Sequence, residues 1–89
     1  IPSGYSLDQN YPNPFNPVTN IQFALPNAGN VKLAVYDMNG KEVAVLVNGQ
    51  LTAGTYKADY NASSLSSGVY FYKLTAKDFT ATKKMILIK

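Results

Sequence analysis

The 89-residue chain contains no cysteine, histidine, arginine or tryptophan. Without cysteine, neither a disulfide nor a thiolate metal site can stabilise the fold, so packing alone must do so. Without histidine, the chain lacks the usual general base near neutral pH and most transition-metal sites. Its few carboxylates show no acid–base spacing, and we expect neither catalysis nor a cofactor or metal. They are Asp8, Asp37, Glu42, Asp59 and Asp78.

The charge of the chain is modest and carried by one basic residue type. The net charge is +3, and all eight basic residues are lysine. Proteins that bind DNA or RNA cluster their basic residues and use arginine for bidentate contacts, so we expect no nucleic-acid partner. No apolar run approaches the roughly 20 residues that span a bilayer, so we expect no transmembrane segment.

The strongest signal that is present is alternation of apolar and polar residues. Ile21, Phe23 and Leu25 alternate with polar or small residues, and other short runs follow the same pattern. This period of two is typical of antiparallel strands with one buried face. We predict an all-β, immunoglobulin-like antiparallel sandwich of about seven strands. The runs lie at 5–9, 21–25, 31–35, 41–47, 56–60, 69–76 and 79–89.

Glycines and asparagines separate these runs. Asn39-Gly40 predicts a hairpin turn in which both residues tolerate positive φ, and Asn48-Gly49 with Ala53-Gly54 is expected to bracket another turn. A serine-rich loop is expected at 61–68. The residues assigned to structural turns are Asp37, Gly40, Gly54 and Gly68.

Two strands carry specific predictions about their faces. Val43, Val45 and Val47 are expected to point one way. The last run has apolar residues on both faces, since Met85 and Leu87 alternate with Ile86 and Ile88. Such a strand is predicted to lie between neighbours.

The least ordinary segment is Tyr11-Pro12-Asn13-Pro14-Phe15-Asn16-Pro17. Three prolines restrict the backbone at nearly every position, so the segment is stiff and costs little entropy to order. We expect the asparagines to form Asx turns with nearby backbone groups. We also expect Tyr11 and Phe15 to pin the segment onto the sandwich as a rigid strap.

Several motifs occur in a recognisable order: Leu7 to Pro17, Val31 to Lys41 with its Tyr-Asp-x-x-Gly pattern, Ala53 to Tyr56, Leu65 to Tyr72 with Ser-Gly-Val-Tyr, and the basic and apolar run Thr82 to Lys89. Together, over 7–89, they resemble the Por-type C-terminal sorting domain, the type A sorting domain of the type IX secretion system. The middle motifs also occur in the flagellar hook-capping protein, whereas the proline segment and the final run make the combination specific. Asn61 stands where many members have aspartate.

The resemblance implies a non-catalytic secretion signal. The expected organisation is a linker at 1–6 from a larger precursor and a sorting domain at 7–89. The implied partners are N-terminal cargo in the same precursor, the type IX translocon, and its outer-membrane shuttle and sortase proteins. We expect a monomer that crosses the periplasm and reaches the cell surface or the medium.

Two surfaces are predicted to be recognised. One is the proline segment, with Tyr11, Pro12, Asn13, Pro14, Phe15, Asn16 and Pro17 as candidates. The other is the terminal strand, where an exposed edge would exchange backbone hydrogen bonds with a partner. Its candidates are Lys83, Lys84, Met85 and Lys89, with the lysines making electrostatic contacts.

Two alternative functions stay open at this point. One is an accessory immunoglobulin-like module of a secreted hydrolase, either a spacer or a carbohydrate binder; the absence of tryptophan argues against sugar binding. The other is a scaffold domain of the hook-capping type. The tyrosines that would stack on sugar are Tyr5, Tyr11, Tyr36 and Tyr72.

Overall fold

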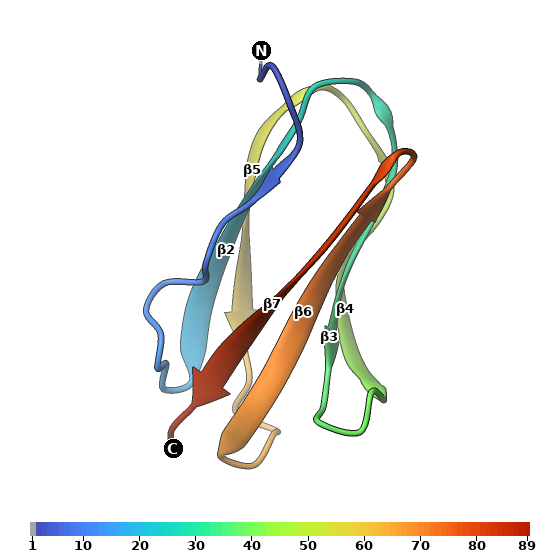
Figure 1. The fold of residues 1–89 in the computed structure, drawn as a ribbon. Coiled ribbons are helices and arrows are strands. Elements are labelled where there is room, and N and C mark those ends of the chain that lie inside the picture. Colours follow the sequence, from blue (N-terminus) through green and yellow to red (C-terminus); the bar gives the residue numbers. More distant parts are fainter. Residues whose placement is uncertain (1) are drawn as a thin grey trace.

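The computed structural model describes residues 2–89 and consists of strands joined by turns (Figure 1). The part of the linker prediction that falls on Ile1 lies outside the described residues. The all-β prediction is confirmed. The strands are β1 (Ser6–Leu7), β2 (Val18–Leu25), β3 (Gly29–Tyr36), β4 (Glu42–Leu51), β5 (Gly54–Asn61), β6 (Gly68–Ala76) and β7 (Phe79–Leu87).

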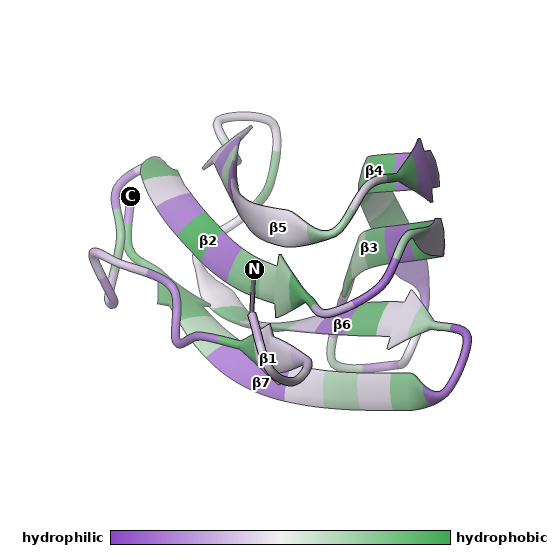
Figure 2. Cartoon of the chain, turned by 90° about the horizontal axis from the view of Figure 1, so that it is seen from above, coloured by the Kyte–Doolittle hydropathy of each residue, from purple (hydrophilic) through white to green (hydrophobic). Residues whose placement is uncertain are grey.

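The strands form two antiparallel sheets that face each other. One sheet has the order β1-β2-β5 and the other the order β4-β3-β6-β7. Seen from above, they lie as two layers (Figure 2). This arrangement is a sandwich and is consistent with the immunoglobulin-like prediction. Among the described residues, no helix is long and apolar enough to span a membrane.

The core lies between the sheets and follows directly from the alternation. In β2 the inward positions begin at Thr19 and continue through Ile21, Phe23 and Leu25, all of them buried. Burying an aliphatic or aromatic side chain of this size contributes roughly 1.5–3 kcal/mol. The other fully buried large side chains are Phe15, Leu33, Val35, Tyr72, Leu74, Met85 and Leu87.

The prediction that Val43, Val45 and Val47 of β4 point one way is wrong. Register shifts in the β3–β4 pairing break the alternation, so Val45 is 45% exposed while Val43 and Val47 pack against the core. Bulges of this kind add residues to one strand only, so a count by twos fails after them. The turn expected between Asn48-Gly49 and Ala53-Gly54 is confirmed, since the chain passes from β4 to β5 at residues 52–53, although β4 itself runs through Asn48-Gly49 to Leu51.

The predicted hairpin between β3 and β4 is confirmed, although by a different turn. Gly40 has φ +82°, whereas no residue other than glycine has positive φ among the described residues. The ability of Asn39 to adopt a positive φ is therefore not used. The Asp37 carboxylate accepts hydrogen bonds from the Asn39 and Lys41 N–H groups at 2.9 Å. Gly54 and Gly68, also with positive φ, begin β5 and β6.

The N-terminal residues contact the sandwich from β1 onward. Ser6 and Leu7 pair with Ala24 and Phe23 of β2. The ring of Tyr5 stacks on that of Phe79, with centroids 5.0 Å apart. The division into a linker at 1–6 and a domain at 7–89 stays a prediction.

Candidate recognition surface

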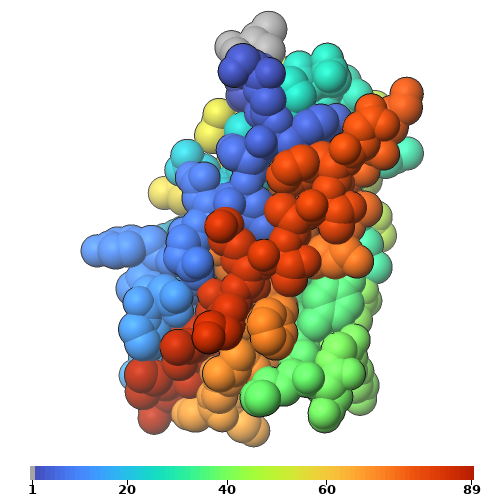
Figure 3. Space-filling view, viewed as in Figure 1, coloured from blue at the N-terminus to red at the C-terminus, as the bar shows by residue number. Residues whose placement is uncertain are grey.

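Residues 8–17, here called the strap, cross from β1 to β2 along the open side of the sandwich. Tyr11 exchanges two backbone hydrogen bonds with Asn20, at 2.9 and 3.0 Å. The peptide bonds Tyr11-Pro12 and Asn13-Pro14 are cis. In the space-filling view, the N-terminal segment in blue lies against the C-terminal strand in red (Figure 3). The two predicted recognition surfaces are therefore neighbours.

The strap continues the sheet beyond β7. Phe15 forms a parallel bridge with Leu87: its N–H donates to the Ile86 carbonyl, and its carbonyl accepts from the Ile88 N–H, both at 2.9 Å. The Asn13 side-chain oxygen accepts from the Ile86 N–H at 3.0 Å. The Gln9 amide donates to the Lys84 carbonyl at 2.7 Å. The end of β7 is thus held between β6 and the strap, as predicted from its two apolar faces.

The side chains of the strap behave differently from one another. Phe15 is 1% exposed and packs in the core, which confirms it as an anchor. Tyr11 is 79% exposed, so the prediction that its side chain pins the strap is wrong; its backbone does so instead. Asn13 bonds to β7, and the predicted local Asx turn is replaced by this distant contact.

Tyr72 of β6 fastens the start of the strap from inside the core. Its hydroxyl donates to the Asp8 carbonyl at 2.6 Å and accepts from the Asn10 N–H at 2.7 Å. Burial disfavours the phenolate and raises the pKa of Tyr72 to about 12; the Asn10 hydrogen bond lowers it, and the nearby Asp8 charge raises it. A neutral phenol is the form that can donate to Asp8.

A buried polar cluster completes this attachment. The Asn10 amide donates to the Thr19 hydroxyl and to the Pro12 carbonyl, at 3.0 and 3.1 Å. The Thr19 hydroxyl in turn donates to the Pro12 carbonyl at 2.9 Å. Both side chains are buried, and such groups remain stable inside a protein only when they are paired. Sequence reasoning missed this cluster, although the alternation of β2 extended back by one step places Thr19 inward.

The terminal residues have distinct environments. Met85 is fully buried. Lys83 pairs with Tyr72 across β6 and β7 and is partly buried, whereas Lys84 is exposed. The Lys89 ammonium donates to the Ser63 and Leu65 carbonyls, at 2.6 and 3.0 Å. The basic residues thus surround the end of β7 without forming one cluster, and their predicted contacts with a partner stay predictions.

We expect Tyr72→Phe to destabilise the domain by about 1–3 kcal/mol, because the Asn10 N–H and Asp8 carbonyl lose their partner. Denaturant unfolding at pH 7 measures this loss. The raised pKa of Tyr72 gives a second readout. The contribution of the Tyr72 hydroxyl to the free energy of unfolding is fully present below pH 10 and is lost as the pH rises through 12. The free energy of unfolding of Tyr72→Phe should therefore decline less over this pH range.

Tyr60→Phe is the control, since the Tyr60 hydroxyl makes no hydrogen bond within residues 2–89. Burial also raises the pKa of Tyr60. A loss of stability at pH 7 equal to that of Tyr72→Phe would contradict a fastening role for the Tyr72 hydroxyl.

A model of the protein family described as "Secretion system C-terminal sorting domain" matches residues 9–89 of the chain. The chain belongs to this family. The match includes both the strap from Gln9 onward and the whole of β7, so it covers the recognition surface described above. No curated protein matches the chain. No solved structure matches it either.

As a sorting domain, the chain is a type IX secretion signal carried at the C-terminal side of a cargo protein. Its role is export of that cargo to the cell surface or the medium, and the machinery of type IX secretion is the partner that membership implies. Such domains are in general non-catalytic. In the sorting domain the motif positions divide into buried supports, such as Phe15 and Met85, and exposed positions, such as Pro12 and Lys84.

Proposed function

We propose that the sorting domain acts as a folded docking module, in which the secretion machinery binds the strap and the end of β7 as one surface. The observation that supports this is the hydrogen bonding between them. Asn13 and Ile86 are 73 residues apart in the sequence, yet their atoms lie 3.0 Å apart. A partner that contacts one segment therefore meets the other as well.

Among residues 2–89, part of the outer edge of β7 makes no backbone hydrogen bond, and this part, here called the free edge, would provide the means of attachment. Ile86 directs both backbone groups toward the strap, and residues two apart in a strand point the same way. The backbone groups of Thr80 and Thr82 and the Lys84 N–H therefore also point away from β6. The last hydrogen bond of the strap to this edge is the one at the Lys84 carbonyl. Unpaired strand edges are templates for a partner strand. We infer that the machinery adds a strand here.

Charge and shape would then set specificity. Lys84, exposed on β7, and Lys83 beside it flank the free edge. Pro12, Asn13, Pro14 and Asn16 present a stiff, exposed border. Phe15, Pro17 and Met85 serve as supports, and Lys89 holds the 63–65 loop while remaining exposed.

The remaining features follow the family. We infer a precursor in which residues 1–6 link N-terminal cargo to a sorting domain at 7–89. The domain would cross the periplasm as a monomer, meet shuttle and sortase proteins of the outer membrane, and perform no catalysis. Fusing residues 1–89 to the C-terminus of an exported fluorescent reporter tests this. Surface delivery that disappears in a translocon-deficient strain supports the proposal; periplasmic retention of a folded fusion contradicts it.

Thr82→Pro should abolish delivery of this reporter while leaving the domain folded. Proline removes an N–H that faces outward, and proline is tolerated on edge strands because no ladder bond is lost. A partner strand would lose a donor and meet the ring instead. Surface fluorescence measures delivery, and circular dichroism with thermal unfolding measures folding.

Thr82→Ala is the matched control, because it removes the same side chain and keeps the N–H group. We expect it to be delivered normally. Equal delivery of the proline and alanine variants would rule out pairing at this edge.

A further inference from the structure

The outer face of the β1-β2-β5 sheet carries two short rows of polar side chains. Asp8 bonds to Gln22 through the backbone, and Gln22 pairs with Lys57. In the next row, Tyr11 pairs with Asn20, which pairs with Asp59. Side chains alternate along a strand, and Ile21 and Phe23 point inward, so the rows point to solvent.

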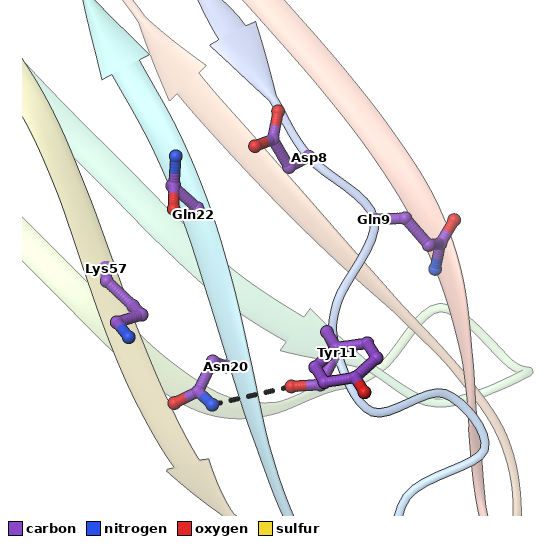
Figure 4. A pocket seen from close by; sticks show the side chains of 6 residues that line it. All are labelled: Asp8, Gln9, Tyr11, Asn20, Gln22 and Lys57. Atoms are coloured by element: carbon purple, nitrogen blue, oxygen red, sulfur yellow. Dashed lines mark hydrogen bonds between the residues drawn. The ribbon is translucent and has the colours of Figure 1, made fainter.

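These rows border a hollow of about 260 Å³. Figure 4 shows its side chains, which come from the strap, β2 and β5, with the Tyr11 ring at one side. The Asn20 amide lies 3.5 Å from the Tyr11 carbonyl and steadies the backbone behind the ring. The lining residues are Asp8, Gln9, Tyr11, Asn20, Gln22 and Lys57.

Tyr11 is an unusual residue to leave exposed. Its neighbours restrict its backbone, since Pro12 follows it and Asn20 pairs with it. The residue is 79% exposed and lies outside the core cluster. A large aromatic side chain on a restrained backbone beside polar groups is amphipathic and has few rotatable bonds, which favours binding at low entropic cost.

The polar groups of the hollow are available to a ligand. Within residues 2–89, the side chains of Asp8, Gln22 and Lys57 form no hydrogen bond or ion pair. Together they offer carboxylate and amide acceptors and amide and ammonium donors. The charges of Asp8 and Lys57 cancel, so a neutral ligand fits better than an anion.

An extended peptide fits this hollow poorly. Both edges of β2 are largely paired among the described residues, by β5 along its length and by β1, Asp8 and Tyr11 on the other side, so β2 offers no continuous edge to a peptide strand. Recognition would therefore rest on side chains. A ligand with many hydroxyl groups and an apolar ring face matches an aromatic ring surrounded by amides and a carboxylate.

We propose that this hollow binds a neutral saccharide, with one sugar ring stacked on Tyr11 and its hydroxyls bonded to Asp8, Gln22 and Lys57. The other tyrosines weighed for sugar stacking lack such a setting. Tyr72 is fully buried, Tyr5 already stacks on Phe79, and Tyr36 does not line this hollow. The hollow shares Asp8, Gln9 and Tyr11 with the strap. Sugar binding is read from amide shifts of the isolated chain and docking from delivery of the reporter, so the failure of one proposal is distinguishable from the failure of the other.

The test is a titration of the ¹⁵N-labelled 89-residue chain with cellotriose, maltotriose and mannotriose, followed by amide chemical shifts. Concentrations up to about 20 mM would reveal millimolar dissociation constants. We expect saturable shifts at residues 8–11, 20–22 and 57 with at least one of these sugars. Tyr11→Ala should weaken binding at least about tenfold, a difference of about 1.4 kcal/mol, and Gln22→Ala should weaken it as well.

Met38→Ala is the control, because Met38 is a large exposed apolar residue on the distant β3–β4 turn. It should bind as the unaltered chain does. The absence of saturable shifts with all three sugars overturns the proposal, as do shifts that persist in Tyr11→Ala. A response to trialanine and to none of the sugars would also overturn it in favour of a peptide.

Discussion

Phe15→Ala should destabilise the sorting domain by about 3–5 kcal/mol, the cost of removing a fully buried aromatic ring. The side chain is 1% exposed and belongs to the core cluster, while its backbone joins the strap to β7. Native domains have about 5–15 kcal/mol of stability in total, so the loss would be a large share of it. Denaturant unfolding monitored by tyrosine fluorescence gives the measurement.

Tyr11→Ala is the matched control for this substitution. It truncates an aromatic residue of the same strap, but the ring is exposed and the backbone hydrogen bonds to Asn20 remain. Exposed substitutions of this type usually change stability by less than about 0.5 kcal/mol. Similar losses in the two variants would show that Phe15 is not the anchor.

Ending the chain at Met85 should unfold the domain or leave it close to unfolded. This deletion removes Leu87 from the core, where burial of a leucine contributes about 2–5 kcal/mol. It also removes the groups of Ile86 and Ile88 that bond to the strap. Hydrogen exchange measures the result, and we expect the amides of Tyr11 and Phe15 to lose their protection.

Lys84→Ala and Lys89→Ala separate loss of fold from loss of a recognition contact. Neither removes a hydrogen bond between backbone groups or a buried apolar side chain, and Lys89→Ala loses only the exposed bonds of its ammonium to the 63–65 loop. Both variants should therefore keep the fold. If the amides of the strap stay protected from hydrogen exchange in the chain that ends at Met85, residues 86–89 do not support the strap. If the lysine variants fold but are not delivered, these charges act in recognition.

The sequence was sufficient to predict the regular strands and insufficient to predict the bulges that interrupt one of them. Alternation in β2 placed Ile21, Phe23 and Leu25 correctly, because one face of the strand is buried and the period is regular. In β4 the bulges interrupt that period, and Val45 turns outward. No local sequence pattern indicates a bulge, because a bulge depends on how the neighbouring strand pairs.

The candidate site shows the same division. The stiffness of the proline segment and the anchoring of Phe15 were predictable from composition. The hydrogen-bond partner of the Asn13 side chain was not predictable, because that partner, Ile86, lies 73 residues away in the sequence. The opposite fates of Tyr11 and Phe15 also depend on tertiary structure, since two aromatic residues in one motif give the same local signal.

The bridge between Phe15 and Leu87 makes this fold strongly non-local. Contacts between residues far apart in the sequence form slowly, because a long loop must close before they contribute stability. Synthesis begins at the N-terminus, so the strap is made early. Its hydrogen bonds to β7 can form only after β7 has been synthesised. A polypeptide that stops short of residue 86 lacks the completed surface. The same bridge would thus limit secretion to cargo whose translation has run through to this strand.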